Sequence, residues 1–216
     1  MYYLLEILDR GRFGMTSIRQ WEFWRNVAVY FCLYSLIGHW IEIPYCLFND
    51  VMFGIVDPET GVYDDPLNPF MIYGFGVVIC AVFMVPLKDF FQRKFPGNWR
   101  PFVLFFLVAV VLAMAMELGM GLVMNQPNAA GVYPLWDNSQ LPGNILGQAW
   151  IVNDLLLGML VTLFTWMAYP ASERFFMSRC TPRGANIRAI VVIVLFVALC
   201  IYEYGYMGVG NIYNIY

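Results

Sequence analysis

The sequence predicts an all-α integral membrane protein, a bundle of five transmembrane helices, from its low charge, its aromatic content and its long apolar runs. Of the 216 residues, 61% are hydrophobic and 12% are charged. A soluble domain carries about 25% charged residues, because water must solvate its surface. Half that charge, together with 18% aromatic residues, indicates that much of the surface contacts lipid.

Five segments are long and apolar enough to cross a bilayer. A spanning helix needs roughly 20 mostly apolar residues at a rise of about 1.5 Å each. The segments are continuously apolar, whereas the strands of a membrane β-barrel alternate over about ten residues, so helices are favoured. The expected spans are residues 26–48, 68–87, 101–125, 144–168 and 188–208.

The basic residues are distributed unevenly between the linkers. All twelve Lys and Arg lie in three regions. These are the N-terminal segment, the linker between the second and third spans, and the linker between the fourth and fifth spans with its edges. Because cytoplasmic loops collect Lys and Arg, the N-terminus is expected in the cytoplasm and the C-terminus outside. No Lys or Arg in a span is expected to neutralise an acid there.

A single transmembrane domain, residues 26–208, is expected between two short segments. Residues 1–25 mix apolar and charged residues and include Trp21 and Trp24 near their end. This pattern is typical of a helix that lies along the cytoplasmic interface, and docking on a cytoplasmic partner is the alternative. Residues 209–216 are expected to form an external tail.

Ionisable residues within the spans are the main chemical signal. Each costs roughly 2.5–3.5 kcal/mol on insertion scales, so each needs a reason. Counting about 1.5 Å per residue from the span midpoints places the four acids in the outer half of the membrane and the histidine near the middle. These residues are His39, Glu42, Glu117, Asp154 and Glu203.

Acids held close together without a basic partner cannot all stay ionised. One interpretation is therefore an outward-facing acidic cavity that binds a proton, a metal ion or a small polar cationic solute. The expected ligand-binding residues are Glu42, Glu117, Asp154, Tyr73, Asn144, Gln148 and His39. The alternative is that each acid is capped separately and only fixes helix packing.

His39 and Glu42 are three residues apart and share a helix face, which suits a proton relay or a metal ligand pair. A lone histidine makes a zinc site weak, and a hydrogen-bonded core histidine is the alternative. The identity of any metal stays open. No cofactor motif is evident, although a bound cation is compatible with the acids. The sequence has no P-loop and no nucleic-acid signature, so any ATPase would be a separate chain.

Three motifs, in the same order along residues 30–165, resemble a bacterial membrane family described as putative ABC-transporter type IV permeases. The first follows the pattern aromatic-Ser-x-x-Gly-x-x-x-Glu, the second reads Pro-Phe-Met-Ile-Tyr-Gly-Phe-Gly, and the third joins an acid to Trp-Asp-Asn-Ser and Asn-Ile-Leu-Gly. They occupy residues 34–42 with Tyr45, residues 69–76, and Glu117 with residues 136–139 and 144–147. The resemblance implies a multi-pass protein of the bacterial inner membrane with a role in transport.

The chain departs from the family's pattern at three places. Asn138 stands where the family has tyrosine, Gln148 stands where a basic residue is usual, and the basic Asn-Arg-Gly motif is absent from residues 49–67. If basic residues neutralise the acids in relatives, this chain lacks that partner, and its ligand differs.

The linker before the fourth span suggests a lid. Trp136 and Asp137 are expected to fold over the mouth of the cavity, whereas an Asx turn from Asp137 to Ser139 is the structural alternative. The leading hypothesis is a transport or channel component that works as a homodimer or within a larger membrane complex. The alternatives are a non-catalytic scaffold subunit and a membrane-embedded enzyme that uses a carboxylate pair.

Overall fold

The computed structural model describes most of the chain. It covers residues 18–54, 65–97, 99–128, 131, 133, 136–177 and 181–207. The expected interfacial segment, residues 1–25, overlaps this set only from Ile18 onward. The expected tail, residues 209–216, lies outside the described residues.

Within the described residues, five helices are long and apolar enough to cross a membrane, which confirms the expected all-α fold with five spans. Each overlaps one segment expected from the sequence. The first, α2, begins at Trp21 and ends at Phe53, and its 33 residues exceed the roughly 20 that a span needs. The five run over Trp21–Phe53, Met71–Lys94, Arg100–Met124, Ile151–Phe175 and Pro182–Gly205.

Three of these helices change their winding along their length, through π-helical turns with wider i→i+5 hydrogen bonding. The second comprises α3 (Met71–Ile79), η1 (Cys80–Met84) and α4 (Val85–Lys94). The fourth comprises α6 (Ile151–Leu163), η2 (Phe164–Ala168), α7 (Tyr169–Ser172) and η3 (Glu173–Met177). The fifth comprises α8 (Pro182–Cys200) and η4 (Ile201–Met207), whereas α5 (Arg100–Met124) is unbroken.

Proline marks the start of two spans. Pro101 lies in the first turn of α5, and Pro182 is the first residue of α8, where the missing N–H costs no helical hydrogen bond. Thr181 caps α8, since its Oγ1 accepts from the backbone N–H of Gly184 at 3.1 Å.

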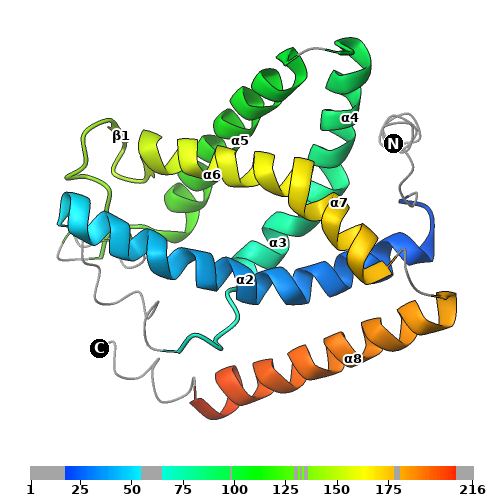
Figure 1. Cartoon of the computed structure of the whole chain (residues 1–216). Helices are drawn as coiled ribbons and strands as arrows, with labels where there is room; N and C mark the ends of the chain where they lie inside the picture. Colours follow the sequence, from blue (N-terminus) through cyan, green and yellow to red (C-terminus); the bar gives the residue numbers. More distant parts are fainter. Residues whose placement is uncertain are drawn as a thin grey trace. The chain divides into compact units, whose positions relative to one another are not determined.

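The chain divides into two compact units. The first unit consists of Met1–Phe83 with Ala171–Tyr216, and the second unit consists of Met84–Pro170. In the first unit α2 packs against α3 and α8 (Figure 1). In the second unit α5 packs against α6 and α4.

Two glycines allow α2 and α3 to approach closely in the first unit. A Cβ on Gly38 would overlap the ring of Tyr73, and a Cβ on Gly74 would overlap Ser35 Oγ and the ring of Phe31. Small residues let the backbones of membrane helices come together in this way. The backbone N–H of Phe70 also donates to the carbonyl of Ser35 at 3.0 Å, which fixes the start of α3 against α2.

A glycine on α6 sets the spacing between α5 and α6 in the second unit. A Cβ on Gly158 would lie 2.9 Å from the backbone nitrogen of Val110 and 3.0 Å from its Cα. Backbone atoms cannot move aside as a flexible side chain can. This contact therefore holds the two helices at a fixed separation.

A two-stranded hairpin leads directly into α6. Strand β1 (Asn144–Ile145) pairs antiparallel with β2 (Ala149–Trp150). Leu146 and Gly147 between them have φ angles of 55° and 70°, the left-handed conformation that tight hairpin turns use. The hairpin therefore fixes where α6 begins, at Ile151.

We predict that Gly158→Ala destabilises the second unit by about 1–3 kcal/mol, since the added methyl group meets the backbone of α5. Thermal unfolding of the purified full chain in detergent measures this. The matched control is Gly119→Ala on α5, where a Cβ meets nothing within 4 Å. That change should be neutral or stabilising by about 0.5–1 kcal/mol. Equal unfolding temperatures for the two variants would refute the close α5–α6 contact.

Candidate functional site

Two of the expected site residues meet in the second unit. Glu117 comes from α5, and Asp154 comes from the first turn of α6. Their carboxyl groups lie next to each other. This pair, called the Glu117–Asp154 pair below, brings together two acids that lie 37 positions apart in the sequence.

Glu117 also contacts the start of α6. Its Oε1 accepts from Asn153 Nδ2 at 2.7 Å, and its carboxyl accepts from the backbone N–H of Trp150. Trp150 precedes the first residue of α6, where the orphan N–H groups and the helix dipole favour an anionic partner. Glu117 therefore receives donors from the helix that it faces.

Asp154 has no such donors. Its side chain is fully buried, and neither Oδ1 nor Oδ2 has a geometric hydrogen-bond donor within the described part of the chain. The Oε2 atom of Glu117 also lacks a hydrogen-bond donor among the described residues. Burial of an ionised carboxylate without partners is costly, and two ionised carboxylates side by side repel each other. Two ionised carboxylates would therefore be strongly destabilised in this environment.

A network of amide side chains lies at the same end of the second unit. Asn125, fully buried at the C-terminal end of α5, donates through Nδ2 to the carbonyl of Trp136 at 2.7 Å and to Gln148 Oε1 at 2.9 Å. Gln148 Nε2 in turn approaches the carbonyl of Asn125 at 3.4 Å. The network ties the linker and the hairpin to α5. A ligand-binding role of Gln148 stays a prediction.

The expected lid residues belong to the same linker. Trp136 Nε1 donates to the carbonyl of Gln148 at 2.8 Å. Asp137 is exposed, and its Oδ1 accepts from the backbone N–H of Ser139 at 2.9 Å, which is the Asx turn named as the structural alternative. Asn144 donates to the carbonyl of Leu141 at 2.7 Å and so supports the loop. A gating role of Trp136 and Asp137 stays a prediction.

The remaining expected residues lie in the first unit. Tyr73 OH donates to Glu42 Oε2 at 2.8 Å, so this acid has its own hydroxyl partner. His39 is fully buried, its Nδ1 lies 2.7 Å from the carbonyl of Asn68, and its ring stacks on Phe70 with centroids 3.9 Å apart. His39 thus has the contacts of a core histidine. A site that unites Glu42 with the Glu117–Asp154 pair stays a prediction.

A second pair of carboxyls in the first unit was missed. Glu203, on η4 and buried, lies next to the carboxyl of Asp65. The neighbouring Tyr204 donates to the carbonyl of Pro69 at 2.6 Å. Asp65 belongs to the acidic linker before the second span, and nothing in its spacing indicates which span it contacts. The pairing depends on tertiary structure.

Two cations next to the expected spans, Arg25 and Lys88, lie inside the observed helices. Both are buried, and both lie in helices that extend beyond the expected spans. Arg25 Nη2 donates to Asn26 Oδ1 at 2.8 Å, and Asn26 Nδ2 donates to Glu173 Oε1 at 3.1 Å. Lys88 Nζ lies 3.3 Å from Asp89 Oδ1. These contacts join the two cations to partners other than the acids expected to form the site.

A metal centre finds no support among the described residues, where no group of three or more His, Cys, Asp or Glu side chains converges. Each of the two carboxyl pairs contains fewer than three such side chains. The same is true of the Glu42–Tyr73 contact. The Glu117–Asp154 pair is therefore suited to a proton or to a cation that protein oxygens and water ligate together.

The comparisons with known proteins identify the family. The model of the family described as "Putative ABC-transporter type IV" matches residues 29–203. Because this match covers most of the chain, the chain belongs to that family. It is a multi-pass membrane protein related by family to ABC transporters. No curated protein and no solved structure matches the chain.

We predict that Asn125→Ala destabilises the second unit by about 1–3 kcal/mol, because it leaves the Trp136 carbonyl and Gln148 Oε1 without their donor. Limited proteolysis between α5 and α6, together with thermal unfolding, measures the effect. The matched control is Gln140→Ala, at an exposed position of the same linker, which should change neither readout. Equal cleavage of both variants would show that the amide network does not hold the linker.

Proposed function

We propose that this member of the putative ABC-transporter type IV family is a transport component in which the Glu117–Asp154 pair binds a proton or one small cation. The supporting observation is the environment of Asp154. A fully buried carboxyl without a donor, next to a second carboxyl, is stable only with an exchangeable positive species between them. Intramembrane acids in such positions mark ion pathways and proton relays.

The chemistry of the pair limits what it can bind. Carboxylate oxygens prefer hard cations, and the described residues offer too few further ligands for a closed metal site. A proton on either carboxyl needs only one acceptor, which the neighbouring carboxyl supplies. A monovalent cation would complete its shell with water. The two ligands compete for the same oxygens, so binding of one should release the other.

The wider arrangement follows from the same proposal. With the N-terminus in the cytoplasm, the pair lies in the outer half of the membrane. In this proposal Trp136 and Asp137 of the same unit cover its outward opening. Five spans are few for an enclosed pathway, so the protein acts as a homodimer or in a larger complex. In that complex a separate ATPase chain supplies the energy.

One observation favours a second candidate, a scaffold subunit in which the acids only position helices. The donors that Glu117 receives from Asn153 and Trp150 are the contacts of a side chain that caps a helix N-terminus. Capping explains Glu117, but it gives no reason for a second carboxyl at position 154, where an amide would donate to Glu117 directly. The transport proposal explains both residues.

We predict that the wild-type chain gains thermal stability in NaCl relative to choline chloride, and that Glu117→Gln and Asp154→Asn abolish this gain. A ligand that binds only the folded state at 100 times its Kd stabilises by about 2.7 kcal/mol. Sodium should also release protons from the wild type in unbuffered solution. The control is Glu22→Gln, which removes an exposed carboxylate and should behave as the wild type.

In liposomes that contain a pH-sensitive dye, the same two variants should reduce proton flux at least tenfold under an imposed potential. If the double variant folds and shows unchanged sodium stabilisation, proton release and flux, the pair is structural and the scaffold candidate is correct.

The orientation makes a separate prediction. In a chain with its native cysteines replaced, Gln126→Cys after α5 should react with an impermeant maleimide added outside intact cells. Gln92→Cys near the end of α4 should react only after permeabilisation. Both glutamines are exposed, so accessibility within the fold is matched. The reverse labelling pattern would invert the proposed topology.

A further inference from the structure

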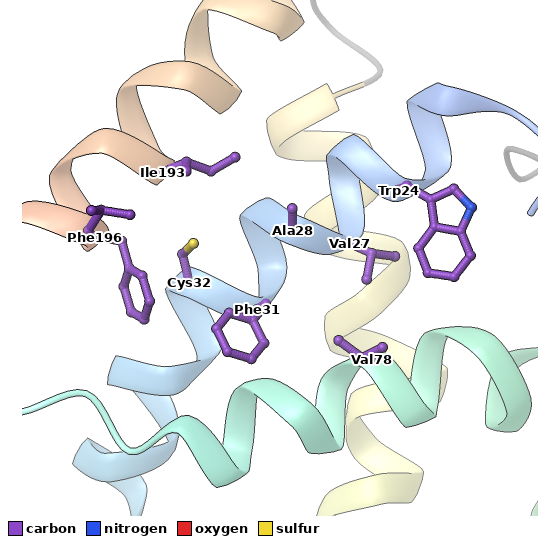
Figure 2. A pocket seen from close by; sticks show the side chains of 9 residues that line it. Trp24, Val27, Ala28, Phe31, Cys32, Val78, Ile193 and Phe196 are labelled. Carbon is purple, nitrogen blue, oxygen red and sulfur yellow. The ribbon is translucent and has the colours of Figure 1, made fainter. Parts of the chain in front are cut away.

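The apolar groove of the first unit holds no charged group. It lies between α2, α3 and α8 and has a volume of about 410 Å³ (Figure 2). Residues such as Val27, Val78 and Phe196 line it, and none of its lining side chains is an acid or a base. Ion chemistry in the described spans therefore rests on carboxyls such as the Glu117–Asp154 pair, whose two members have different surroundings.

Glu117 has a side-chain donor. Asn153 Nδ2 donates to its Oε1 at 2.7 Å, which is short for an N–H···O hydrogen bond. An amide N–H can only donate, so this contact favours the form of Glu117 that carries no proton on Oε1. Hydrogen bonds to an ionised acceptor are roughly twice as strong as bonds to a neutral one. Asn153 therefore stabilises Glu117 as a carboxylate.

Asp154 has the opposite surroundings, although it is the next residue along α6. It is fully buried, and neither of its oxygens accepts from a donor in the described part of the chain. Burial without a donor disfavours the charged form of a carboxyl. The neutral form needs only one acceptor for its O–H, and Glu117 is next to it.

Three buried oxygens of the pair lack a donor among the described residues. They are Glu117 Oε2 and both carboxyl oxygens of Asp154. A proton on Asp154 that is donated to Glu117 Oε2 leaves the negative charge on the carboxyl that Asn153 stabilises. The reverse assignment places the charge on Asp154, which has no donor of its own, and sets a neutral carboxyl against the Asn153 amide.

No other ionisable group lies close to the pair on the described elements that pack against α6. These elements are α5, β2 and η2. Apart from Glu117, the ionisable residue that they contain is Arg100, at the start of α5. It lies 17 positions before Glu117. That spacing is about 25 Å along the helix, so the distribution of the proton depends on the two carboxyls and on Asn153.

We propose that Asp154 carries the exchangeable proton of the pair, that Glu117 stays ionised, and that Asn153 is the positioning residue that sets this order. This assignment rests on the proposed function, because it divides the roles within the same pair. When a sodium ion enters, the O–H bond of Asp154 breaks, its electron pair stays on the carboxylate, and the proton goes to water. The pair then keeps one net negative charge in both states.

The test uses the full chain in liposomes, labelled with ¹³C at the side-chain carboxyl of either aspartate or glutamate. Infrared difference spectra between choline chloride and sodium chloride report the C=O stretch of a carboxyl that loses its proton. We expect the wild-type band to shift with the aspartate label and to ignore the glutamate label. Asp154→Asn should abolish the band.

Asn153→Leu removes the donor at similar side-chain volume. Part of the band should then shift with the glutamate label, because Glu117 now competes for the proton. The sodium concentration that removes half of the band should rise roughly fivefold, as expected for the loss of one hydrogen bond to a charged group. The transfer is expected to be partial, since the backbone N–H of Trp150 still donates to Glu117.

Two further variants separate this role from a structural one. Asn153→Gln keeps an amide donor and should keep the aspartate-only pattern. Gln126→Leu makes the same kind of change at an exposed position after α5, where the amide donates to the carbonyl of Leu122, and should leave the spectra unchanged.

The proposal fails if the wild-type band follows the glutamate label or both labels equally, and the proposed function then stands with the roles reversed or shared. It also fails if Asn153→Leu folds and changes neither the label pattern nor the sodium dependence. If sodium removes no carboxyl band from the wild type, the exchange of a proton for a cation at the pair fails as well. The wild-type spectra need no variant, so they decide the assignment even if Asn153→Leu does not fold.

Discussion

Polar side chains within the five spans must find their partners inside the protein, because lipid hydrocarbon offers none. This constraint accounts for most of the side-chain contacts between helices. Asn26 joins Arg25 to Glu173, Tyr73 donates to Glu42, and Asn125 joins two segments of the linker before α6. Each contact removes a polar group from hydrocarbon and at the same time fixes two chain segments against each other.

Close packing of the helices brings these polar groups within hydrogen-bonding distance of each other. In the first unit the overlap that a Cβ on Gly38 would have with Tyr73 shows that this ring lies against the α2 backbone, one turn before Glu42. In the second unit Gly158 lies against Val110, about one turn after Asp154 on α6. Larger residues at these glycines would separate the helices and break the contacts of the acids. The glycines therefore act on the chemistry through helix spacing, without contacting a ligand.

The sequence predicted the architecture well, because its signal is strong and local. Continuous apolar runs identify spans whatever their neighbours are, and all five were found. The ends of the spans were predicted less well. Arg25 and Lys88 read as linker residues because they are charged, yet both are buried in the helices once Asn26 and Asp89 provide polar contacts. A hydropathy profile ends a span at a charged residue, because it contains no information about the polar partner that makes burial of the charge tolerable.

The site was predictable only in part, for a related reason. Depth along a span can be counted from the sequence, but depth does not show which helices are neighbours. In the structure Glu117 and Asp154 lie next to each other. Gln148 and Asn144, expected as polar neighbours of the site, hydrogen-bond within the amide network and the loop. Asp65 was not considered as a neighbour of Glu203, because the two residues are far apart in the sequence and only the tertiary structure brings them together.

The two kinds of carboxyl environment in the spans have different consequences. Glu42 faces the hydroxyl of Tyr73, a permanent donor that stabilises its carboxylate without any exchangeable species. Glu117 faces Asp154, and two carboxylates have four acceptor oxygens and no permanent donor between them. A hydroxyl partner stabilises a charge in place, whereas a second carboxylate repels it unless a proton or a cation lies between them. If the proposed function holds, the occupancy of the pair depends on pH and on cation concentration, which is the property that coupling to transport requires.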